Sequence, residues 1–360
     1  MGVFEYFDPD TNATVYHVLP NSGSNSTIST FQSETESLAS GSTIQSDDLP
    51  GYFVSHHGRQ QPASNNIVRW FPSDNIRRYI LRYLSYTWAF GGNYVGPVKE
   101  ILAPIVGRER RVLELGTKTG TWTQSMAEEF PHVQFRSVDI VPIIAHAPRP
   151  NIIFEVYDYT EGILLENESQ DAVFLNVIME MVKDYRALLR EVHRVLRPGG
   201  LIHIIDHNPR LWDPQTRATA ARHTNPVGCH FVDLIRDSLA NTGADPDTID
   251  KLPDWLAPDS GVWSDRAGGR KGFERIQSVV RMYPAYPHPG HPCMDGLDAR
   301  VAPYLAHLSV MSTRDTFGLL RDRGMGDEEA EQLIEDVIVE LKNPRNCVLL
   351  KPVCVYGVKV

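Results

Sequence analysis

The chain has 360 residues, of which 42% are hydrophobic and 22% charged, as expected of a soluble globular protein with one large or two ordinary domains. Its formal net charge of −10 and acidic pI of about 5.7 argue against a protein that binds nucleic acid through bulk positive charge. No run of ~18 apolar residues and no secretory signal pattern is present, so we expect no membrane span and no export. We therefore expect the chain in the cytoplasm, or in the nucleus if it is regulatory.

The first 58 residues differ in composition from the rest of the chain. They contain no Lys or Arg, and about half of residues 21–46 are Ser or Thr, a composition typical of disorder. We therefore expect a disordered Ser/Thr-rich tail over residues 1–58. Two interpretations of this tail stay open: a solvated extension, or an arm that is phosphorylated or binds a protein partner.

Helices are expected in residues 59–106, ahead of the central part of the chain. Apolar residues recur at helical spacing from Ile76 to Leu84, and residues 95–105 look like a second helix. The basic residues of the first helix fall on its other face: Arg77, Arg78 and Arg82. For the aromatic residues near its end, both core packing and the lining of a cavity remain open.

A strand, a glycine turn and a helix mark the centre of the chain. The apolar run ending at Leu115 predicts a buried strand, Gly116 and Gly120 punctuate the turn, and a helix is expected from Thr121. Such a turn lets a ligand approach backbone N–H groups at a helix N-terminus. A second apolar run ends at Asp139, 19 residues after Gly120 (139 − 120), close to the ~20 residues typical of a ribose-binding acid. An ordinary strand-turn-helix without a ligand is the alternative.

Strands and helices continue to alternate after this turn. Strands are expected at residues 152–156, 171–176 and 201–205, and a helix with one apolar stripe from Val182 to Leu196. This alternation predicts a parallel sheet with helices on both faces, whose ligands lie beyond the carboxyl ends of the strands. Polar residues fall at those ends: Glu114, Asp139, Asp158, Asn176 and His207.

The remainder of the chain is expected to cover and complete this core. Residues 213–272 are irregular and rich in Pro, Asp, Gly and Trp, which suggests an insertion with short helices that partly covers the active site. Residues 273–360 are expected to add strands and helices that complete the sheet and the substrate pocket. The predicted organisation is a tail, N-terminal helices, a nucleotide-binding core, an insertion and a C-terminal part, at residues 1–58, 59–106, 107–212, 213–272 and 273–360.

The spacing Glu114-x-Gly116-x-x-x-Gly120 resembles motif I of the class I S-adenosylmethionine (SAM) methyltransferases. Further segments, among them Phe71-Pro-Ser-Asp74 and the run from Leu188 to Gly200, are similar to the fungal LaeA-like (UMTA-like) branch, and the likeness covers roughly residues 57–360. The resemblance implies an α/β, Rossmann-like sheet of about seven mostly parallel strands, with SAM as cofactor. Lys118 departs from the pattern, because many members carry glycine there.

The resemblance also implies roles for individual residues. In that family the glycine turn receives the methionine end of SAM, which places Glu114 near the methionine amine. Asp139 would bind the ribose hydroxyls and Asp158 the adenine amino group. The full set of expected cofactor-binding residues is Glu114, Gly116, Thr117, Gly120, Asp139, Asp158 and Asn176.

Three functions remain open at this point. The first is in-line methyl transfer to a small-molecule acceptor of the secondary-metabolite type. The second is a LaeA-like regulator that works in a protein complex, with the tail as a docking arm. The third is a SAM-binding fold that transfers no methyl group.

Candidates for acid–base or metal chemistry are few. His207 is the first candidate for a general base, since imidazole titrates near neutral pH, although a surface or loop histidine is the alternative. His288, His291 and Cys293 form an HxxHxC pattern. Their proline neighbours and the missing fourth ligand lead us to predict no metal site.

Overall fold

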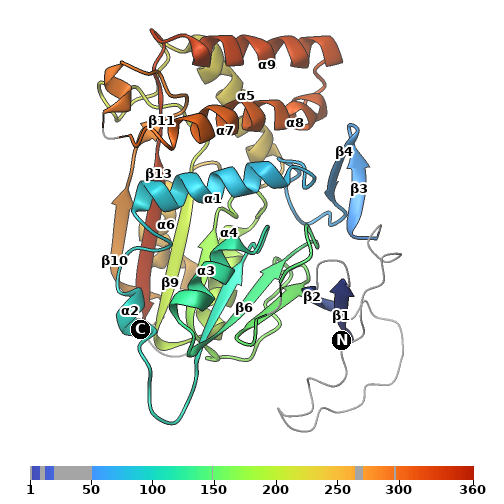
Figure 1. The fold of residues 1–360 in the computed structure, drawn as a ribbon, viewed down its shortest axis with the longest axis vertical. Helices are drawn as coiled ribbons and strands as arrows, with labels where there is room; N and C mark the ends of the chain where they lie inside the picture. Colours follow the sequence, from blue (N-terminus) through green and yellow to red (C-terminus); the bar gives the residue numbers. More distant parts are fainter. Residues whose placement is uncertain (1, 9–12, 20–50, 148, 264–270, 296) are drawn as a thin grey trace.

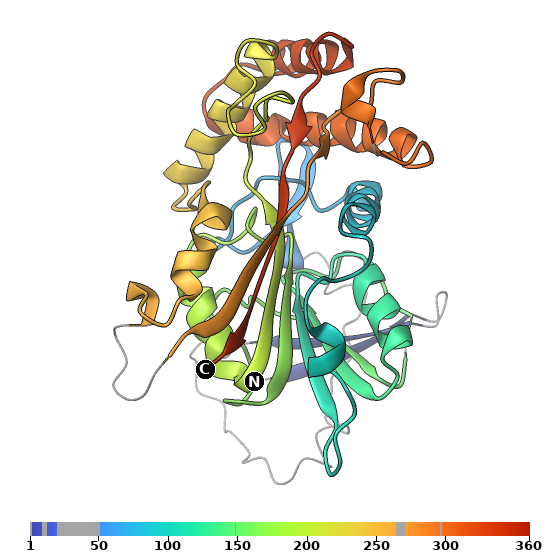
Figure 2. The same cartoon turned by 90° about the vertical axis from the view of Figure 1, so that its left-hand side faces the viewer.

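The computed structural model describes residues 2–8, 13–19, 51–147, 149–263, 271–295 and 297–360. These residues form a nine-stranded sheet in the order β1-β2-β7-β6-β5-β8-β9-β13-β10 (Figure 1). Helices cover both faces of this sheet, and a layer of further helices lies across one end of it (Figures 1 and 2).

Seven of these strands form the centre of the fold. They are β5 (Arg110–Leu115), β6 (Val133–Asp139), β7 (Ile152–Val156), β8 (Gln170–Asn176), β9 (Leu196–His207), β10 (Phe273–Val280) and β13 (Pro352–Lys359). Neighbours from β7 to β9 pair in parallel, whereas β13 runs antiparallel to both β9 and β10. Helices bury β5 and β8 on both faces, which explains why their sequences are almost continuously apolar. The expected Rossmann-like sheet of seven mostly parallel strands is confirmed.

Two N-terminal strands extend this sheet beyond β7. β1 (Gly2–Asp8) and β2 (Ala13–Leu19) form an antiparallel hairpin, and β2 pairs in parallel with β7. This hairpin differs from the disordered tail that we expected over residues 1–58. Both segments are rich in Val, Phe and Tyr, which favour strands, whereas the Ser/Thr-rich composition that predicts disorder belongs to residues 21–46. The most Ser/Thr-rich part of the expected tail, residues 20–50, lies outside the described residues.

A short hairpin and four helices accompany the first half of the sheet. They are β3 (Phe53–His56) and β4 (Arg59–Pro62), followed by α1 (Ile76–Phe90), α2 (Val98–Ile101), α3 (Thr121–Glu129) and α4 (Tyr185–Val195). The α4 helix begins where the Asp184 side chain accepts a hydrogen bond of 2.9 Å from the Ala187 amide, an N-cap. It buries the stripe of Leu188, Val192 and neighbouring residues against the sheet, as its helical period predicts.

The layer across the end of the sheet combines segments from two parts of the chain. Its elements, with the connecting pieces, are α5 (Pro226–Asn241), α6 (Thr248–Leu256), η2 (Gly261–Trp263), β11 (Tyr283–Pro284), η3 (Pro292–Met294), α7 (Ala302–Asp315), α8 (Phe317–Asp322), α9 (Asp327–Lys342) and β12 (Leu349–Leu350). In Figures 1 and 2, α5, α7, α8 and α9 lie together above the sheet, whereas α6 descends along its side. None of the helices within the described ranges combines the length and apolar character needed to cross a bilayer.

Candidate functional site

The turn between β5 and α3 has a backbone shape that requires glycine at two positions. Gly116 and Gly120 adopt left-handed conformations, with φ of 88° and 66°. A Cβ on Gly116 would lie 2.6 Å from Cγ2 of Ile178, and one on Gly120 would lie 2.6 Å from Nδ1 of His146. The Gly116 amide also donates a 2.8 Å hydrogen bond to the Val138 carbonyl, which fixes the turn at the end of β6. The sequence prediction of a tight glycine turn at the strand tips is confirmed.

Glu114 is buried at the carboxyl end of β5 and accepts hydrogen bonds from three side chains. The donors are Ser137 Oγ at 2.5 Å, Asn176 Nδ2 at 3.2 Å and the Thr123 hydroxyl. Burial raises the pKa of this carboxyl to about 7, and the three donors oppose that rise only in part. Glu114 lines a cavity of about 70 Å³, which we call the turn cavity. Other predicted cofactor residues line the same cavity: Gly116, Thr117 and Asn176.

Asp139 lies at the end of β6, and its carboxylate holds the backbone of the turn. One oxygen accepts a 2.6 Å hydrogen bond from the Lys118 amide, and the other accepts a 2.7 Å bond from the Ile140 amide. Burial raises the pKa of the carboxyl, against the effect of these two donors. The side chain is 4% exposed and borders a small cavity of about 10 Å³, which we call the Asp139 cavity.

Lys118 lines both of these cavities, as does Tyr79. Its backbone is left-handed, with φ of 52°. Its ammonium donates a 3.2 Å hydrogen bond to the Asn176 carbonyl and a second to the Val177 carbonyl. It also lies 4.0 Å from a carboxylate oxygen of Glu180 and 5.9 Å from the centre of the Tyr79 ring. Burial lowers the pKa of this lysine, and the neighbouring acids counteract the shift.

The donors and acceptors of the crevice fit S-adenosylmethionine chemically, but the space is divided. The turn cavity combines a carboxylate, an amide and a hydroxyl beside backbone that a ligand can approach closely, which suits the amino-acid end of the cofactor. The Asp139 cavity holds roughly one water molecule at its volume of about 10 Å³. A nucleoside at Asp139 therefore requires side chains around this cavity to move, and Lys118 and Tyr79, which line both cavities, are the first candidates.

Asp158 lies apart from these cavities and is not among the residues that line them. Its carboxylate accepts a 2.6 Å hydrogen bond from Ser64 Oγ and a 3.3 Å bond from Asn66 Nδ2, both from the segment before α1. Its other oxygen accepts from the Thr160 hydroxyl and amide, at 2.5 and 3.0 Å. In the described structure the carboxylate thus fastens the N-terminal segment to the loop after β7. Its role toward adenine stays a prediction.

A larger, mostly apolar cavity of about 140 Å³ lies between the end of β9 and the helical layer; we call it the apolar cavity. Aromatic and aliphatic side chains from several segments line it, including Trp70, Phe71, Phe231, Tyr283, Leu305 and Leu350. It shares Arg82 and Tyr86 with the turn cavity, so the same two side chains of α1 form the boundary between the two spaces. The helical layer therefore encloses a compartment next to the turn cavity.

His207 borders the apolar cavity at the end of β9. Its Nδ1 lies 2.6 Å from the Tyr86 hydroxyl, within hydrogen-bond distance. Burial lowers the pKa of His207 to about 4, so the imidazole is neutral at physiological pH. The adjacent Asp206 accepts hydrogen bonds from the Met179 and His207 amides, and burial raises its pKa to about 6.

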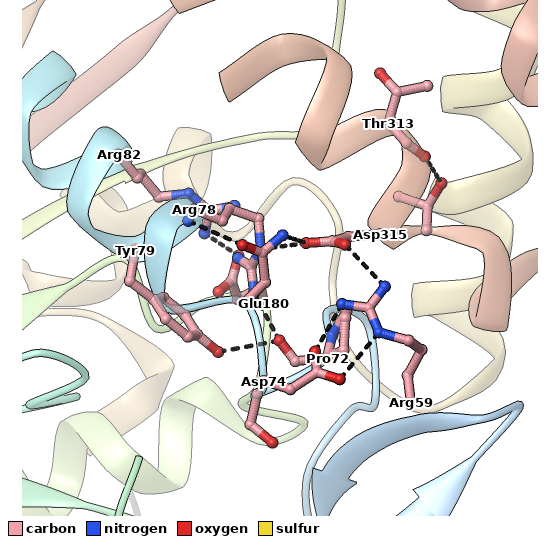
Figure 3. Close-up of polar contacts among 12 residues, drawn as sticks. Arg59, Pro72, Asp74, Arg78, Tyr79, Arg82, Glu180, Thr313 and Asp315 are labelled. Atoms are coloured by element: carbon pink, nitrogen blue, oxygen red, sulfur yellow. Dashed lines mark hydrogen bonds and ion pairs between the residues drawn. The ribbon is translucent and has the colours of Figure 1, made fainter. Parts of the chain in front are cut away.

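Two buried ion pairs on α1 support this site, and sequence reasoning missed both (Figure 3). Arg82 donates to Glu180 at 2.5 Å, with side chains only 7% and 5% exposed. Arg78 donates to Asp315 of α7 at 2.9 Å and to the Pro72 carbonyl at 2.9 Å. The pairs connect α1 to the strand tips on one side and to the helical layer on the other.

The orientation of α1 differs from that of an ordinary amphipathic helix, which buries its apolar stripe and exposes the basic residues on its other face. The apolar residues Ile76, Ile80 and Leu84 are 38–40% exposed in the described structure, whereas Arg78 is fully buried and Arg82 is 6% exposed. The helix therefore turns much of its basic face inward, because Glu180 and Asp315 supply counter-charges there.

Comparison with known proteins places the fold and the glycine turn in a wider context. A family model described as a methyltransferase domain matches residues 82–249. The secondary metabolism regulator laeA of Coprinopsis cinerea is 28% identical over 268 residues, which cover 71% of this chain and 61% of that protein. A malonyl-[acyl-carrier protein] O-methyltransferase of Hahella chejuensis is 33% identical over 220 residues, 52% of this chain and 76% of the relative.

Among solved structures, a phosphoethanolamine N-methyltransferase of Haemonchus contortus aligns over 83% of this chain and 61% of its own. The sequence identity is 15% and the TM-score 0.40, so this likeness carries no functional argument. The match to the methyltransferase family model carries more weight, because its range of residues 82–249 includes the glycine turn.

Proposed function

This chain belongs to the class I S-adenosylmethionine-dependent methyltransferases, with a likeness to their LaeA-like branch, and we propose that it methylates a small, largely apolar acceptor. The observation that carries this proposal is the adjacency of two spaces: the turn cavity, with the predicted cofactor residues, and the apolar cavity beyond Arg82 and Tyr86. When bound, the cofactor supplies a methyl group activated by a positively charged sulfur. The chain itself supplies binding, alignment and, for some acceptors, a base.

The residues of the glycine turn have distinct tasks in this proposal. Glu114 and Asn176, joined by their hydrogen bond, hold the amine of the methionine end, and Gly116 lets the cofactor approach the backbone. Thr117 contributes a hydroxyl to the same cavity and Gly120 shapes the start of α3. Asp139 binds the ribose hydroxyls once the Lys118 side chain has moved.

His207 is the proposed general base. It faces the apolar cavity, where the acceptor would lie, and its neutral imidazole is able to accept a proton at physiological pH. The Tyr86 hydroxyl lies against Nδ1. If Nδ1 carries the ring proton and donates it to Tyr86, then Nε2 presents its lone pair to an acceptor. Tyr86 is thus proposed to set the tautomer.

Regulation through a protein complex is the second candidate function. It is favoured by the relative from Coprinopsis cinerea, which is named a secondary metabolism regulator and of which this chain matches 61%. In that case methyl transfer, if it occurs, would act on a protein, and the N-terminal segment would bind the partner. The third candidate is a SAM-binding fold that transfers no methyl group and uses the pocket as a scaffold or for another reaction.

Two experiments test these functions. Isothermal titration of the purified chain with SAM should show binding, and Asp139→Ala should weaken it by about 1–3 kcal/mol, because a charged acceptor is lost. Labelled SAM should then be incubated with a cell extract and the chain. Label in small molecules supports the leading proposal, label in proteins supports the regulatory one, and binding without transfer supports the third. Failure of both the native chain and a Lys118→Gly variant to bind SAM would overturn the proposed function.

A further inference from the structure

Three potential metal ligands from two segments of the chain meet in the helical layer. His288 follows β11, Cys293 lies in η3, and Cys347 precedes β12. His288 Nδ1 and Cys293 Sγ are 3.8 Å apart, and one ligand atom from each of the three residues lies within 4.8 Å of the others. The side chains converge although Cys347 is 54 residues beyond Cys293 (347 − 293).

The His288 ring is oriented as a metal ligand usually is. Its Nε2 lies 2.8 Å from the backbone carbonyl of Leu341, at the end of α9, to which it donates a hydrogen bond. This bond places the ring proton on Nε2 and leaves the lone pair of Nδ1 directed toward Cys293. Histidine ligands in metal sites typically make such a bond with their other nitrogen, because it fixes the tautomer and the ring plane. His288 is 3% exposed, so this orientation is held by packing as well.

We propose that His288, Cys293 and Cys347 form a binding site for a single zinc ion or a similar thiophilic cation. Tetrahedral zinc with its usual bond lengths of ~2.3 Å to sulfur and ~2.0 Å to nitrogen places a sulfur and a nitrogen ligand ~3.5 Å apart and two sulfur ligands ~3.8 Å apart. The observed separation of 3.8 Å between Sγ and Nδ1 is thus ~0.3 Å longer than the sulfur–nitrogen value, a difference that a small side-chain rotation closes. Two thiolates and one imidazole are a set that favours zinc over magnesium or calcium, which prefer oxygen.

The fourth coordination position faces a solvent-accessible cavity. Cys293, Cys347, His291 and Asp295 line this cavity, which has a volume of about 440 Å³. His291 lies near the cluster, with its ring centre 6.1 Å from that of His288. We assign the fourth position to water, because His291 is not among the residues whose ligand atoms converge. Binding converts both cysteine thiols to thiolates and releases two protons to solvent.

The proposed ion would fasten an irregular part of the helical layer. Among its described residues, the segment 285–301 has the short η3 helix as its only regular element. The ion would connect this segment to the strand β12 through Cys347. Through the Leu341 carbonyl, the same site would be coupled to α9. We expect its main effect to be on stability, since the described glycine-turn residues lie elsewhere.

Metal analysis of the full chain tests the proposal. After removal of bound metal with a chelator and exchange into buffer with a phosphine reductant, one equivalent of Zn²⁺ should bind per chain and raise the melting temperature. Co²⁺ in its place should give a thiolate-to-metal charge-transfer band. Cys293→Ser, Cys347→Ser and His288→Gln should each lower zinc affinity at least tenfold. Cys229→Ser, a buried free cysteine in α5, serves as the matched control and should bind zinc as the native chain does.

Several outcomes would overturn the site. The proposal fails if zinc binds at less than one equivalent, or if binding survives in the Cys293→Ser, Cys347→Ser double variant. It also fails if mass spectrometry finds Cys293 and Cys347 still joined as a disulfide after treatment with the phosphine reductant. If a variant unfolds, two measurements on the native chain test the proposal instead: the Co²⁺ charge-transfer band and the alkylation of its thiols. Bound zinc should protect both Cys293 and Cys347 from the alkylating reagent. None of these readouts depends on SAM, so they are separate from the test of the proposed function.

Discussion

The Lys118 amide donates a 2.6 Å hydrogen bond to the carboxylate of Asp139, so the residue that departs from the family pattern is joined to the acid expected to bind ribose. The same lysine extends its ammonium to the Asn176 and Val177 carbonyls. Its backbone holds the shape of the turn, while its side chain divides the crevice that the turn creates. Removing the side chain should therefore separate these two effects.

Replacing Lys118 by glycine should strengthen SAM binding at least tenfold, or by about 1.4 kcal/mol. Glycine adopts the φ of 52° without strain and leaves the space between the two cavities open. Isothermal titration of both proteins measures the change. Lys99→Gly is a useful comparison, because this lysine is 73% exposed and should not affect binding.

An unchanged or weaker affinity in Lys118→Gly would show that the lysine is no obstacle. It would then follow that its ammonium leaves the crevice at little cost, or that it contributes a contact to the cofactor. Retained melting temperature in the variant confirms that the turn itself is intact.

Local sequence patterns predicted the sheet and the glycine turn, because both depend on residues close together in the chain. The α1 helix shows where such patterns fail. Its apolar and basic stripes both follow a helical period, and which of them turns inward depends on Glu180 and Asp315, 98 and 237 residues away from their partners. Charged residues are buried only when paired, and no local signal reveals a partner at that distance.

The candidate site also has some features that local sequence patterns predict and others that they do not. The position of Glu114 beside Gly116 follows from the motif, since strand and turn fix it. The position of the Lys118 side chain does not, because it depends on carbonyls at the end of β8. The cluster at the HxxHxC segment also differs from the sequence pattern: Cys347 approaches His288 and Cys293 through the pairing of β11 with β12, whereas His291 does not join them.

Glu114 should make the stability of the fold depend on pH near neutrality. Burial raises its pKa from 4.5 to about 7, so the folded state holds the proton more tightly than the unfolded state. The resulting stabilisation is complete below the unfolded pKa and is lost as pH rises through about 7. Between pH 4.5 and pH 8 the native chain should lose on the order of 3 kcal/mol relative to Glu114→Gln, which cannot ionise.

Urea unfolding of the two proteins at matched pH values measures this difference. The subtraction removes contributions from other groups that titrate over the same interval, such as Asp206 and His207. Parallel pH profiles for the native chain and Glu114→Gln would mean that folding leaves the pKa of Glu114 at its unfolded value, which contradicts the raised pKa.

His207→Gln should reduce the rate of methyl transfer by about 10²–10⁴-fold, the usual contribution of a general base, and leave SAM affinity unchanged. In the native chain His207 is neutral near pH 7, so the rate should not change with pH in that range because of this residue. The rate should fall as the pH drops toward the His207 pKa of about 4. Transfer of label from SAM to the extract's acceptor measures the rate. His223→Gln, at an exposed histidine, is the control.

Tyr86→Phe tests how the imidazole is oriented. Loss of the hydroxyl removes the partner of Nδ1, so the rate should fall less than in His207→Gln and in the same direction. A His207→Gln variant that transfers methyl groups at the native rate would exclude His207 as the base and leave alignment as the main contribution of the chain.

Glu180→Ala should destabilise the fold by about 3–5 kcal/mol, because it leaves the buried Arg82 guanidinium without its counter-ion. Burial alone would raise the pKa of Glu180, but the charges of Arg82 and Lys118 hold it below its usual value, so the carboxylate is charged in the fold. The exposed pair Arg222–Asp233 gives the control, and Asp233→Ala should leave the urea midpoint unchanged. The double variant Arg82→Met, Glu180→Leu should recover much of the loss, because an apolar pair needs no counter-charge. If Glu180→Ala is no less stable than Asp233→Ala, the Arg82–Glu180 pair does not hold α1 against the strand tips.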